Sequence, residues 1–268
     1  MKTVVFHKWW IIPVVAVLLA GGCSKSETST ETEGYGTLQI RLEPDAMIST
    51  RAEIATSPVP SAEEFSLTIS GTDYSHSWPS ITAFNDSQTR LKTGIYTVEI
   101  SYGEPAAEGV GKPYYYGSKS VEILARKAIE ESLTARIANS QVLVTATEAF
   151  LDYFHEATFT VTTSAGNRFT FTPGSETADE AVFVQAGTRL TLSGEAKLQS
   201  QTGTAFDRVY TFPEQTLEQT VARTRHTFRF DAKDNGSATL TINLNDEFLD
   251  ERTIDVELNE DSQKDNNA

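Results

Sequence analysis

The stretch KTGIYTVEISY, residues 92–102, decides the fold that this sequence predicts. Its apolar residues Tyr96, Val98, Ile100 and Tyr102 alternate with the polar residues between them. Successive side chains of a β-strand point to opposite faces of its sheet, so this period of two predicts a strand with one buried face and one wet face. Such strands are typical of antiparallel sheets.

The same alternation recurs along most of the chain. The runs are separated by turn signals, of which Asp234-Asn235-Gly236 is typical of a tight hairpin. Only Thr147 to Phe154 predicts a short helix, with Thr147 as its N-cap. The apolar members of the other alternating runs are Leu38, Ile40 and Leu42; Phe65, Leu67 and Ile69; Phe159 and Val161; Phe169 and Phe171; Leu190 and Leu192; Phe228 and Phe230; Leu240, Ile242 and Leu244; and Ile254, Val256 and Leu258.

The pattern also repeats once. The run FSLT that starts at residue 65 aligns with FTVT at residue 159, and the turn residue Gly94 aligns with Gly187. Lys127 aligns with Arg223 in the same way. The strands after the two glycines are out of phase by one residue, so the alignment requires a β-bulge or a slip in register. Chance similarity between Phe-rich strands is the alternative.

The predicted fold is therefore all-β, with two tandem antiparallel β-sandwiches of the transthyretin or immunoglobulin kind. We predict that they span residues 34–137 and 138–258. Residues 23–33, which after Cys23 are only Ser, Thr, Glu and one Lys, predict a flexible tether because they cannot bury apolar surface. The polar residues 259–268 predict a disordered tail.

The first 22 residues predict a cleaved secretory signal. They carry Lys2, Lys8 and no acid, and an apolar run follows that is shorter than the ~20 residues of a membrane-spanning helix. The run ends in Ala20-Gly21-Gly22, directly before Cys23, the only cysteine of the chain. A lone cysteine cannot form an internal disulfide, and in this place it predicts the lipid-attachment site of a bacterial lipoprotein. The alternative is a plain signal peptide with an incidental cysteine.

The charge balance excludes some partners. The chain has 37 acids and 22 Lys and Arg, a net charge of −15, and loss of the two leader lysines would make it −17. Nucleic-acid binding requires basic patches, so no nucleic-acid partner is expected. The net charge also disfavours binding to an anionic lipid surface by charge alone, and it favours a solvated, self-repelling exterior.

Several motifs resemble a lipoprotein family of unknown function from the Bacteroidota, common in gut Bacteroides. The residues that carry the resemblance are Gly34-Tyr35-Gly36-Thr37-Leu38, Ser49-Thr50-Arg51-Ala52, Leu91 to Val98, and Lys112-Pro113-Tyr114-Tyr115-Tyr116-Gly117. The similarity covers about Gly34 to Leu258. The family supplies no assigned activity.

More distantly, the layout is similar to that of fimbrillins, which are lipoprotein precursors built of two transthyretin-like sandwiches. In fimbrillins a trypsin-like protease cuts after an arginine that follows the first strand, and a strand of a neighbouring subunit fills the groove that opens. This resemblance implies that Arg51, which follows the predicted strand Thr37 to Glu43, is a processing site. The alternative is an uncut, exposed linker.

The aromatic run Tyr114, Tyr115 and Tyr116 is the best candidate for a ligand contact. It follows the Gly- and Pro-containing segment 103–113, which predicts an exposed loop. Amphipathic rings suit stacking on sugars or contact with protein. The alternative is that Tyr114 and Tyr116 pack inside the sandwich. Trp78 is a similar candidate, with a plug at the end of a strand as its alternative.

Catalytic and metal-binding patterns are weak. His7 belongs to the leader, and His76, His155 and His226 show no metal-ligand spacing. Asp231, Asp234 and Asn235 predict a hairpin more than a calcium loop, and the acidic cluster Asp246, Glu247, Asp250 and Glu251 predicts a solvated connection. No cofactor and no metal are expected.

The sequence thus predicts a non-catalytic lipoprotein of the outer membrane, facing outward and anchored by its lipid. Its expected role is adhesion, or that of a fimbrillin-like subunit with neighbouring surface-protein subunits as partners. The second hypothesis is a glycan-binding surface lipoprotein that captures carbohydrate through Tyr115 or Trp78. A hydrolase with two facing acids is a distant third.

Overall fold

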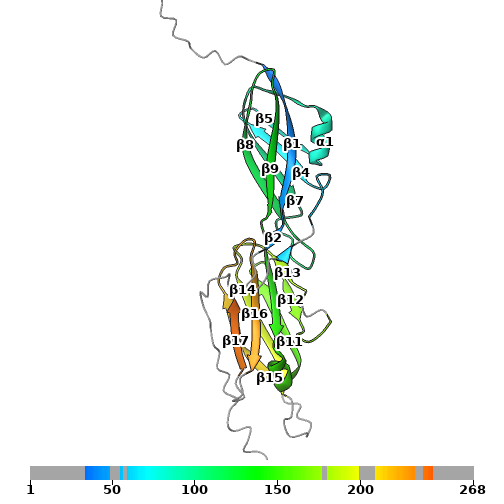
Figure 1. Ribbon diagram of the computed structural model, residues 1–268. Helices are drawn as coiled ribbons and strands as arrows, with labels where there is room; N and C mark the ends of the chain where they lie inside the picture. The colour runs from blue at the N-terminus through cyan, green and yellow to red at the C-terminus, as the bar shows by residue number, and fades with distance from the viewer. Residues whose placement is uncertain are drawn as a thin grey trace, which may run out of the picture. The chain divides into compact units, whose positions relative to one another are not determined.

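The computed structural model describes residues 34–48, 55–56, 59–176, 180–198, 209–232 and 238–243 (Figure 1). Cys23, Arg51, the acidic cluster of residues 246–251, and the predicted signal, tether and tail lie outside these residues. Within the described part of the chain, no helix is long and apolar enough to cross a membrane.

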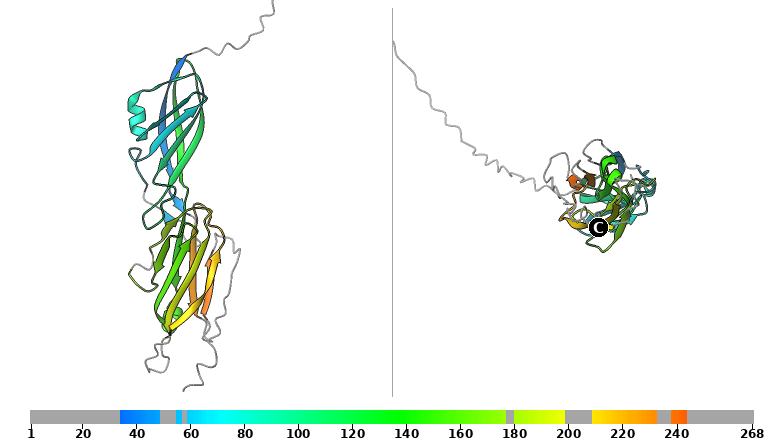
Figure 2. Two further views of the ribbon diagram at one scale, coloured as in Figure 1. Left: turned by 180° about the vertical axis from the view of Figure 1, so that it is seen from behind. Right: turned by 90° about the horizontal axis from the view of Figure 1, so that it is seen from below.

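Residues 35–137 form one seven-stranded sheet. Its spatial order is β5-β4-β7-β8-β9-β1-β6, and helix α1 (Ile81–Ser87) lies beside β1 (Figures 1 and 2). A separate two-residue hairpin joins β2 (Met47–Ile48) to β3 (Ala55–Thr56). The strands of the sheet are β1 (Tyr35–Asp45), β4 (Ser66–Gly71), β5 (Tyr74–Trp78), β6 (Arg90–Lys92), β7 (Gly94–Tyr102), β8 (Tyr115–Ile123) and β9 (Ala128–Ile137).

Residues 140–243 form two four-stranded sheets, β13-β10-β16-β17 and β12-β11-β14-β15. Helix α2 (Glu148–Tyr153) contacts β16 and β11. The strands are β10 (Ser140–Ala146), β11 (Phe154–Thr163), β12 (Arg168–Phe171), β13 (Val182–Val184), β14 (Leu190–Leu198), β15 (Val209–Leu217), β16 (Arg225–Ala232) and β17 (Ala238–Asn243).

Five strand pairings of the first region recur in the second. In the first, β1 pairs antiparallel with β6 and parallel with β9, while β4 pairs with β5 and β7, and β7 with β8. In the second, β10 pairs antiparallel with β13 and parallel with β16, while β11 pairs with β12 and β14, and β14 with β15. We call residues 35–137 the first repeat and residues 140–243 the second repeat.

Backbone hydrogen bonds repeat as well. Arg126 donates its N–H to the Tyr35 carbonyl, and Arg223 donates its N–H to the Asn139 carbonyl, at 2.9 Å in both cases. Both arginines have a left-handed backbone, with φ of 59° and 63°. The internal repeat predicted from the sequence is therefore present in the structure, with Arg126 rather than Lys127 as the counterpart of Arg223.

The apolar residues form two clusters. Phe65, Leu67 and Ile69 lie in the first and are fully buried. Phe159 and Val161, their counterparts, lie in the second and are also fully buried. The alternation in the sequence therefore predicted correctly which side chains of these strands face the core. A β-bulge interrupts the pairing of β14 with β15 between residues 192 and 194, close to the place where the aligned repeats fall out of phase.

The predicted all-β fold of two tandem sandwiches is confirmed, and so is the short helix with its cap. Thr147 is the N-cap of α2, and its hydroxyl accepts a hydrogen bond from the Phe150 N–H at 3.2 Å. The sheets differ from the prediction in one respect, because β1–β9 and β10–β16 are parallel. The sequence analysis also missed α1. The predicted domain limits, 34–137 and 138–258, stay a prediction.

Candidate functional site

The structure reverses the predicted orientation of the tyrosine run. Tyr115 begins β8 and points inward, where its ring is fully buried and contacts Phe65 and Tyr102, with ring centroids 5.9 and 6.2 Å away. Tyr115 therefore cannot offer a stacking platform to a ligand. Because strand side chains alternate, burial of Tyr115 turns Tyr116 outward.

Tyr116 and Tyr114 are the accessible members of the run. Tyr116 is 38% exposed, and its hydroxyl donates a hydrogen bond to the Glu99 carboxylate at 2.5 Å. This hydrogen bond raises the pKa of Tyr116. Tyr114 is half-buried, and its backbone N–H donates to Asn139 Oδ1 at 3.2 Å. Neither Tyr114 nor Tyr116 is among the residues that line the groove between α1 and β1.

Trp78 closes the end of β5. Its ring is half-buried between His76 and Phe84, with centroid distances of 4.4 and 4.8 Å and edge-on geometry. Phe84 is a buried residue of α1, so Trp78 packs this helix against the sheet. The geometry agrees better with a plug at a strand end than with a sugar platform.

Residues 103–113, predicted to be an exposed loop, make several hydrogen bonds to the second repeat. Glu108 lies in it, and its carboxylate accepts hydrogen bonds from three groups of the second repeat: Thr163 Oγ1 at 2.7 Å, Asn167 Nδ2 at 2.7 Å and the Gln185 N–H at 3.1 Å. The next residue, Gly109, exchanges two backbone hydrogen bonds with Phe183, of 2.9 and 3.0 Å. Phe183 in turn places its buried ring in the apolar cluster of the first repeat.

A second contact joins the repeats through Asp45 at the end of β1. Its Oδ2 lies 2.8 Å from Arg223 Nη2 and 3.5 Å from Arg136 Nε. Asn139, almost fully buried between β9 and β10, donates its amide to the Lys112 carbonyl at 2.8 Å. Both residues use their side chains to fasten the two repeats together.

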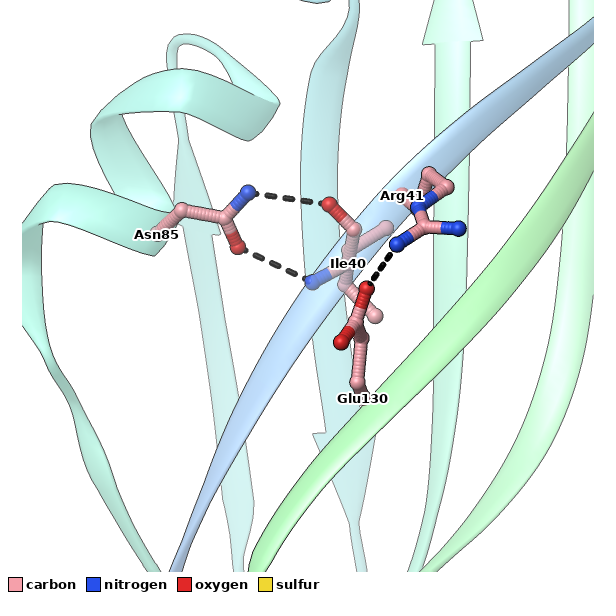
Figure 3. A network of polar contacts seen from close by, with 4 residues as sticks. All are labelled: Ile40, Arg41, Asn85 and Glu130. Carbon is pink, nitrogen blue, oxygen red and sulfur yellow. Dashed lines mark hydrogen bonds and ion pairs between the residues drawn. The ribbon is translucent and has the colours of Figure 1, made fainter.

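A polar groove lies where α1 approaches β1. The side chain of Asn85, in α1, pairs with the backbone of Ile40: its Nδ2 donates to the Ile40 carbonyl and its Oδ1 accepts from the Ile40 N–H, both at 2.9 Å (Figure 3). These are the two bonds that a neighbouring strand residue would make. Asn85 thus replaces β6, whose pairing with β1 ends at Thr37.

The groove has a volume of about 350 Å³, and mostly polar residues line it. Gln88 follows α1 with a left-handed backbone, φ 49°, at the position where this helix ends. Arg41 and Glu130 form an ion pair across β1 and β9 beside the groove (Figure 3), but both are exposed and such pairs contribute little to stability. The lining residues that offer hydrogen-bonding side chains are Thr37, Gln39, Asn85, Gln88 and Glu130.

His226 is a titratable group that the sequence analysis did not assign. It is fully buried in β16, and its Nε2 accepts a hydrogen bond from the Val221 N–H at 3.0 Å. The neutral ring therefore carries its proton on Nδ1, which is buried and makes no hydrogen bond with any described residue. Burial lowers the pKa of His226 to about 4.

Metal chemistry finds no support in the described part of the chain, where no group of three or more His, Cys, Asp or Glu could hold a metal ion. Asp231 accepts a hydrogen bond from the N-cap hydroxyl of Thr147, so it supports α2. β16 and β17 pair antiparallel, with Ala232 opposite Ala238, and the predicted turn Asp234-Asn235-Gly236 between them lies outside the described residues.

Residues 32–260 match the protein family described as "Domain of unknown function (DUF4493)". The chain belongs to this family. No curated protein matches this DUF4493 chain in sequence.

Solved structures resemble the DUF4493 chain only distantly. A proposed cell adhesion protein from Bacteroides uniformis is 8% identical over 81% of this chain and 98% of that one, with a TM-score of 0.41. A proposed polysaccharide-binding protein from Bacteroides thetaiotaomicron is 9% identical over 79% and 96%, with a TM-score of 0.39. The fimbrial anchor protein Mfa2 from Porphyromonas gingivalis is 12% identical over 79% and 97%, with a TM-score of 0.34.

Sequence reasoning missed the residues that make the most specific contacts in this DUF4493 protein. The helix that carries Asn85 could have been found, because Ser80 is a good N-cap and Ile81 and Phe84 have helical spacing; the Ser80 hydroxyl does accept from the Ala83 N–H at 2.9 Å. Glu108 carried no signal, since it is one acid among 37.

Proposed function

We propose that this protein is a non-catalytic lipoprotein of the bacterial outer membrane, anchored through Cys23 and facing outward, that serves in adhesion or as a fimbrillin-like structural subunit. The observation that carries the proposal is the position of β1. It lies between β9 and β6, and the segment with the proposed processing site, Arg51, follows it in the sequence.

β1 pairs with β9 over more residues than with β6. Residues Thr37–Asp45 pair in parallel with Ala128–Arg136 of β9, whereas only Tyr35, Gly36 and Thr37 pair with β6. Towards the core, β1 contributes the buried residues Leu38 and Ile40. A cut after Arg51 would separate β1 from the rest of the chain, and its departure would leave the edge of β9 unpaired. A strand from a second copy could then supply both the backbone hydrogen bonds and the apolar side chains.

Cleavage and assembly are tested together by determining the N-terminus of the protein taken from native cells. We expect two forms, one that begins at Cys23 and one that begins at Ala52, with only the second in assemblies that resist mild denaturation. Arg51→Ala should abolish the shorter form and the assemblies. The matched control is Arg168→Ala, an exposed arginine of the second repeat, which should change neither. A protein that begins at Cys23 in every fraction would refute the subunit proposal.

The anchor and its orientation have separate tests. Labelled palmitate should be incorporated into the parent and not into Cys23→Ala, and the variant should leave the envelope fraction. Protease added to intact cells should digest the described residues if the protein faces outward. Full protection of the body would place it on the periplasmic side and contradict that part of the proposal.

The polar groove favours a second candidate, a glycan-binding surface lipoprotein. Amide and hydroxyl groups of Thr37, Gln39 and Gln88 offer hydrogen bonds of the kind that an uncharged sugar makes, and the groove of about 350 Å³ matches the smaller end of known ligand pockets. On a glycan array, Gln39→Ala with Gln88→Ala should remove any binding. Trp78→Ala and Tyr116→Ala should leave it intact, and the reverse result would move the sugar site to the aromatic residues.

A further inference from the structure

Three large apolar side chains are exposed at one end of the first repeat. Tyr35 is 52% exposed, Ile95 69% and Leu124 47%. Backbone hydrogen bonds hold the segments that carry them together: the Thr93 N–H donates to the Gly34 carbonyl at 2.8 Å, and the Arg126 N–H donates to the Tyr35 carbonyl at 2.9 Å. We call this region, where the described chain begins at Gly34, the Gly34 end.

Gly36 allows β1 to pack closely against the turn between β8 and β9. A Cβ atom on Gly36 would lie 2.5 Å from the Leu124 carbonyl oxygen and 2.9 Å from that of Lys127. Only glycine lets β1 approach the turn between β8 and β9 so closely. The Gly34-Tyr35-Gly36 signature therefore brings the start of β1, which carries the exposed Tyr35, close to the backbone of the turn that carries the exposed Leu124.

The charge of the Gly34 end is opposite to that of the whole protein. Among the residues of this end that the structure describes, four exposed ones are basic and two exposed ones are acidic, whereas the chain as a whole carries a net charge of −15. Arg90 also lies over the Tyr35 ring, 5.7 Å from its centroid. The basic residues are Arg90, Lys92, Arg126 and Lys127, and the acids are Asp73 and Glu122.

We propose that the Gly34 end is a membrane-contact surface that lies against the anionic headgroups of the bilayer in which the lipid of Cys23 is inserted. The inference rests on the lipid anchor of the proposed function. The eleven residue-to-residue steps from Cys23 to Gly34 can span at most ~40 Å even when fully extended, so the anchor keeps this end near the bilayer.

The physical basis is the combination of apolar and basic side chains. Exposed aromatic and aliphatic residues enter the boundary between headgroups and acyl chains, and Lys and Arg are attracted to anionic lipid within a Debye length. The many acids of the remaining surface are repelled by the same headgroups. Attraction at the Gly34 end and repulsion of the remaining surface would orient the anchored protein with the Gly34 end towards the bilayer.

The single cysteine permits a test that does not depend on acylation in the cell. The chain from Cys23 to Ala268 is coupled through Cys23 to a maleimide lipid in vesicles of phosphatidylcholine alone or of phosphatidylcholine with phosphatidylglycerol. A membrane-impermeant amine reagent then labels exposed lysines, which are quantified by mass spectrometry. Lys127 reports the Gly34 end, and Lys112, exposed in the loop 103–113, is the internal control.

We expect at least three-fold slower labelling of Lys127 on the phosphatidylglycerol vesicles than on phosphatidylcholine, with full reactivity restored in 1 M salt and no change at Lys112. Arg90→Glu with Arg126→Glu should abolish the protection. The matched control, Arg168→Glu with Arg229→Glu, makes the same change in net charge at exposed positions of the second repeat and should keep it.

Equal labelling of Lys127 on both kinds of vesicle would overturn the proposal, and so would loss of protection in the control variant. Failure of palmitate labelling in cells would instead remove the natural anchor and leave this result standing, so the two failures are distinguishable.

Discussion

The buried histidine of the second repeat should make this protein sensitive to acid in a defined pH range. The change to make is His226→Gln, because the Gln side-chain oxygen can still accept a hydrogen bond from the Val221 N–H while the side chain does not titrate. In the parent, the pKa of His226 is lowered by burial from 6.5 to about 4. The unfolded chain therefore binds a proton on this ring at a higher pH than the folded protein does.

The sign and size of the effect follow from this difference. Because the folded pKa is depressed, the stabilisation is present above pH 6.5 and is lost progressively as the pH falls towards 4. The fall of the His226 pKa from 6.5 to about 4 corresponds to about 3 kcal/mol at 1.36 kcal/mol per pKa unit. That is a large share of the 5–15 kcal/mol that is typical of a folded domain.

Urea unfolding at several pH values between 7.5 and 4 measures the effect. Trp78 is the only tryptophan after residue 22, so in the chain from Cys23 to Ala268 its fluorescence reports the first repeat, and circular dichroism reports both repeats. The parent and His226→Gln share all 37 acids, so their general loss of stability in acid cancels in the difference between them. We expect the free energy of unfolding of the second repeat in the parent to fall, relative to the variant, by about 3 kcal/mol between pH 7.5 and 4.

An NMR titration of the parent keeps the test valid if the variant folds poorly. The ring protons of His226 should titrate near pH 4. A midpoint near 6.5, or a difference in unfolding free energy between parent and variant that stays constant with pH, would show that the ring is not held neutral by burial and would refute the reasoning.

Three further substitutions test the contacts that join elements of the fold. Asn85→Ala should lower the free energy of unfolding of the first repeat by about 2–3 kcal/mol in urea titrations, because it leaves the Ile40 N–H and carbonyl without partners. A change below about 0.5 kcal/mol would argue against this pairing. Glu108→Ala should speed amide hydrogen exchange at Gln185 at least ten-fold, while amides in β4 keep their protection; unchanged exchange at Gln185 would show that the carboxylate contact is absent in solution. Gly117→Ala should destabilise the first repeat by more than 2 kcal/mol in thermal unfolding, because its Cβ would lie 2.4 Å from a backbone oxygen of β9, and a stable variant would show that β8 and β9 separate easily.

The alternation of apolar and polar residues was enough to predict most of the fold. Phe65, Leu67 and Ile69 face the core as their period of two requires, and Thr147 caps the one helix that the pattern predicted. These features are local, since each depends on residues within one strand or one turn. The internal repeat was also visible, because equivalent positions in equivalent strands need similar residues.

Pairings between distant segments were not predictable from the same pattern. A strand buried on one face alternates in the same way whether its neighbour runs parallel or antiparallel, so the parallel pairs β1–β9 and β10–β16 left no local signal. In the tyrosine run the side chains alternate between the two faces as predicted, but Tyr115 faces the core instead of the solvent. Which face it takes depends on the pairing of Tyr115 with Ile137 in β9. Asn85 bonds to the backbone of Ile40, 45 residues away, and any β-strand residue would accept such a bond equally well.

The two repeats protect the same sheet edge by different means. In the second repeat β17 pairs with β16 from Thr227 to Ala232, and this pairing covers the outer edge of β16. In the first repeat the equivalent edge of β9 meets β8 only at Ile137 and Arg136. There Lys119 of β8 lies 2.5 Å from the Glu131 carboxylate and donates to the Ser132 carbonyl at 3.3 Å.

A lysine and paired charges on an otherwise open edge are a common defence against unwanted strand pairing. The close crossing of Gly117 over Thr134 brings β8 near enough for Lys119 to provide it. A protein that admits a partner strand in the place of β1 would have to keep the other edge of β9 closed, or strands would add on both sides. The Lys119 contact is therefore consistent with a single, directed strand exchange, and it gives the proposed subunit one acceptor edge rather than two.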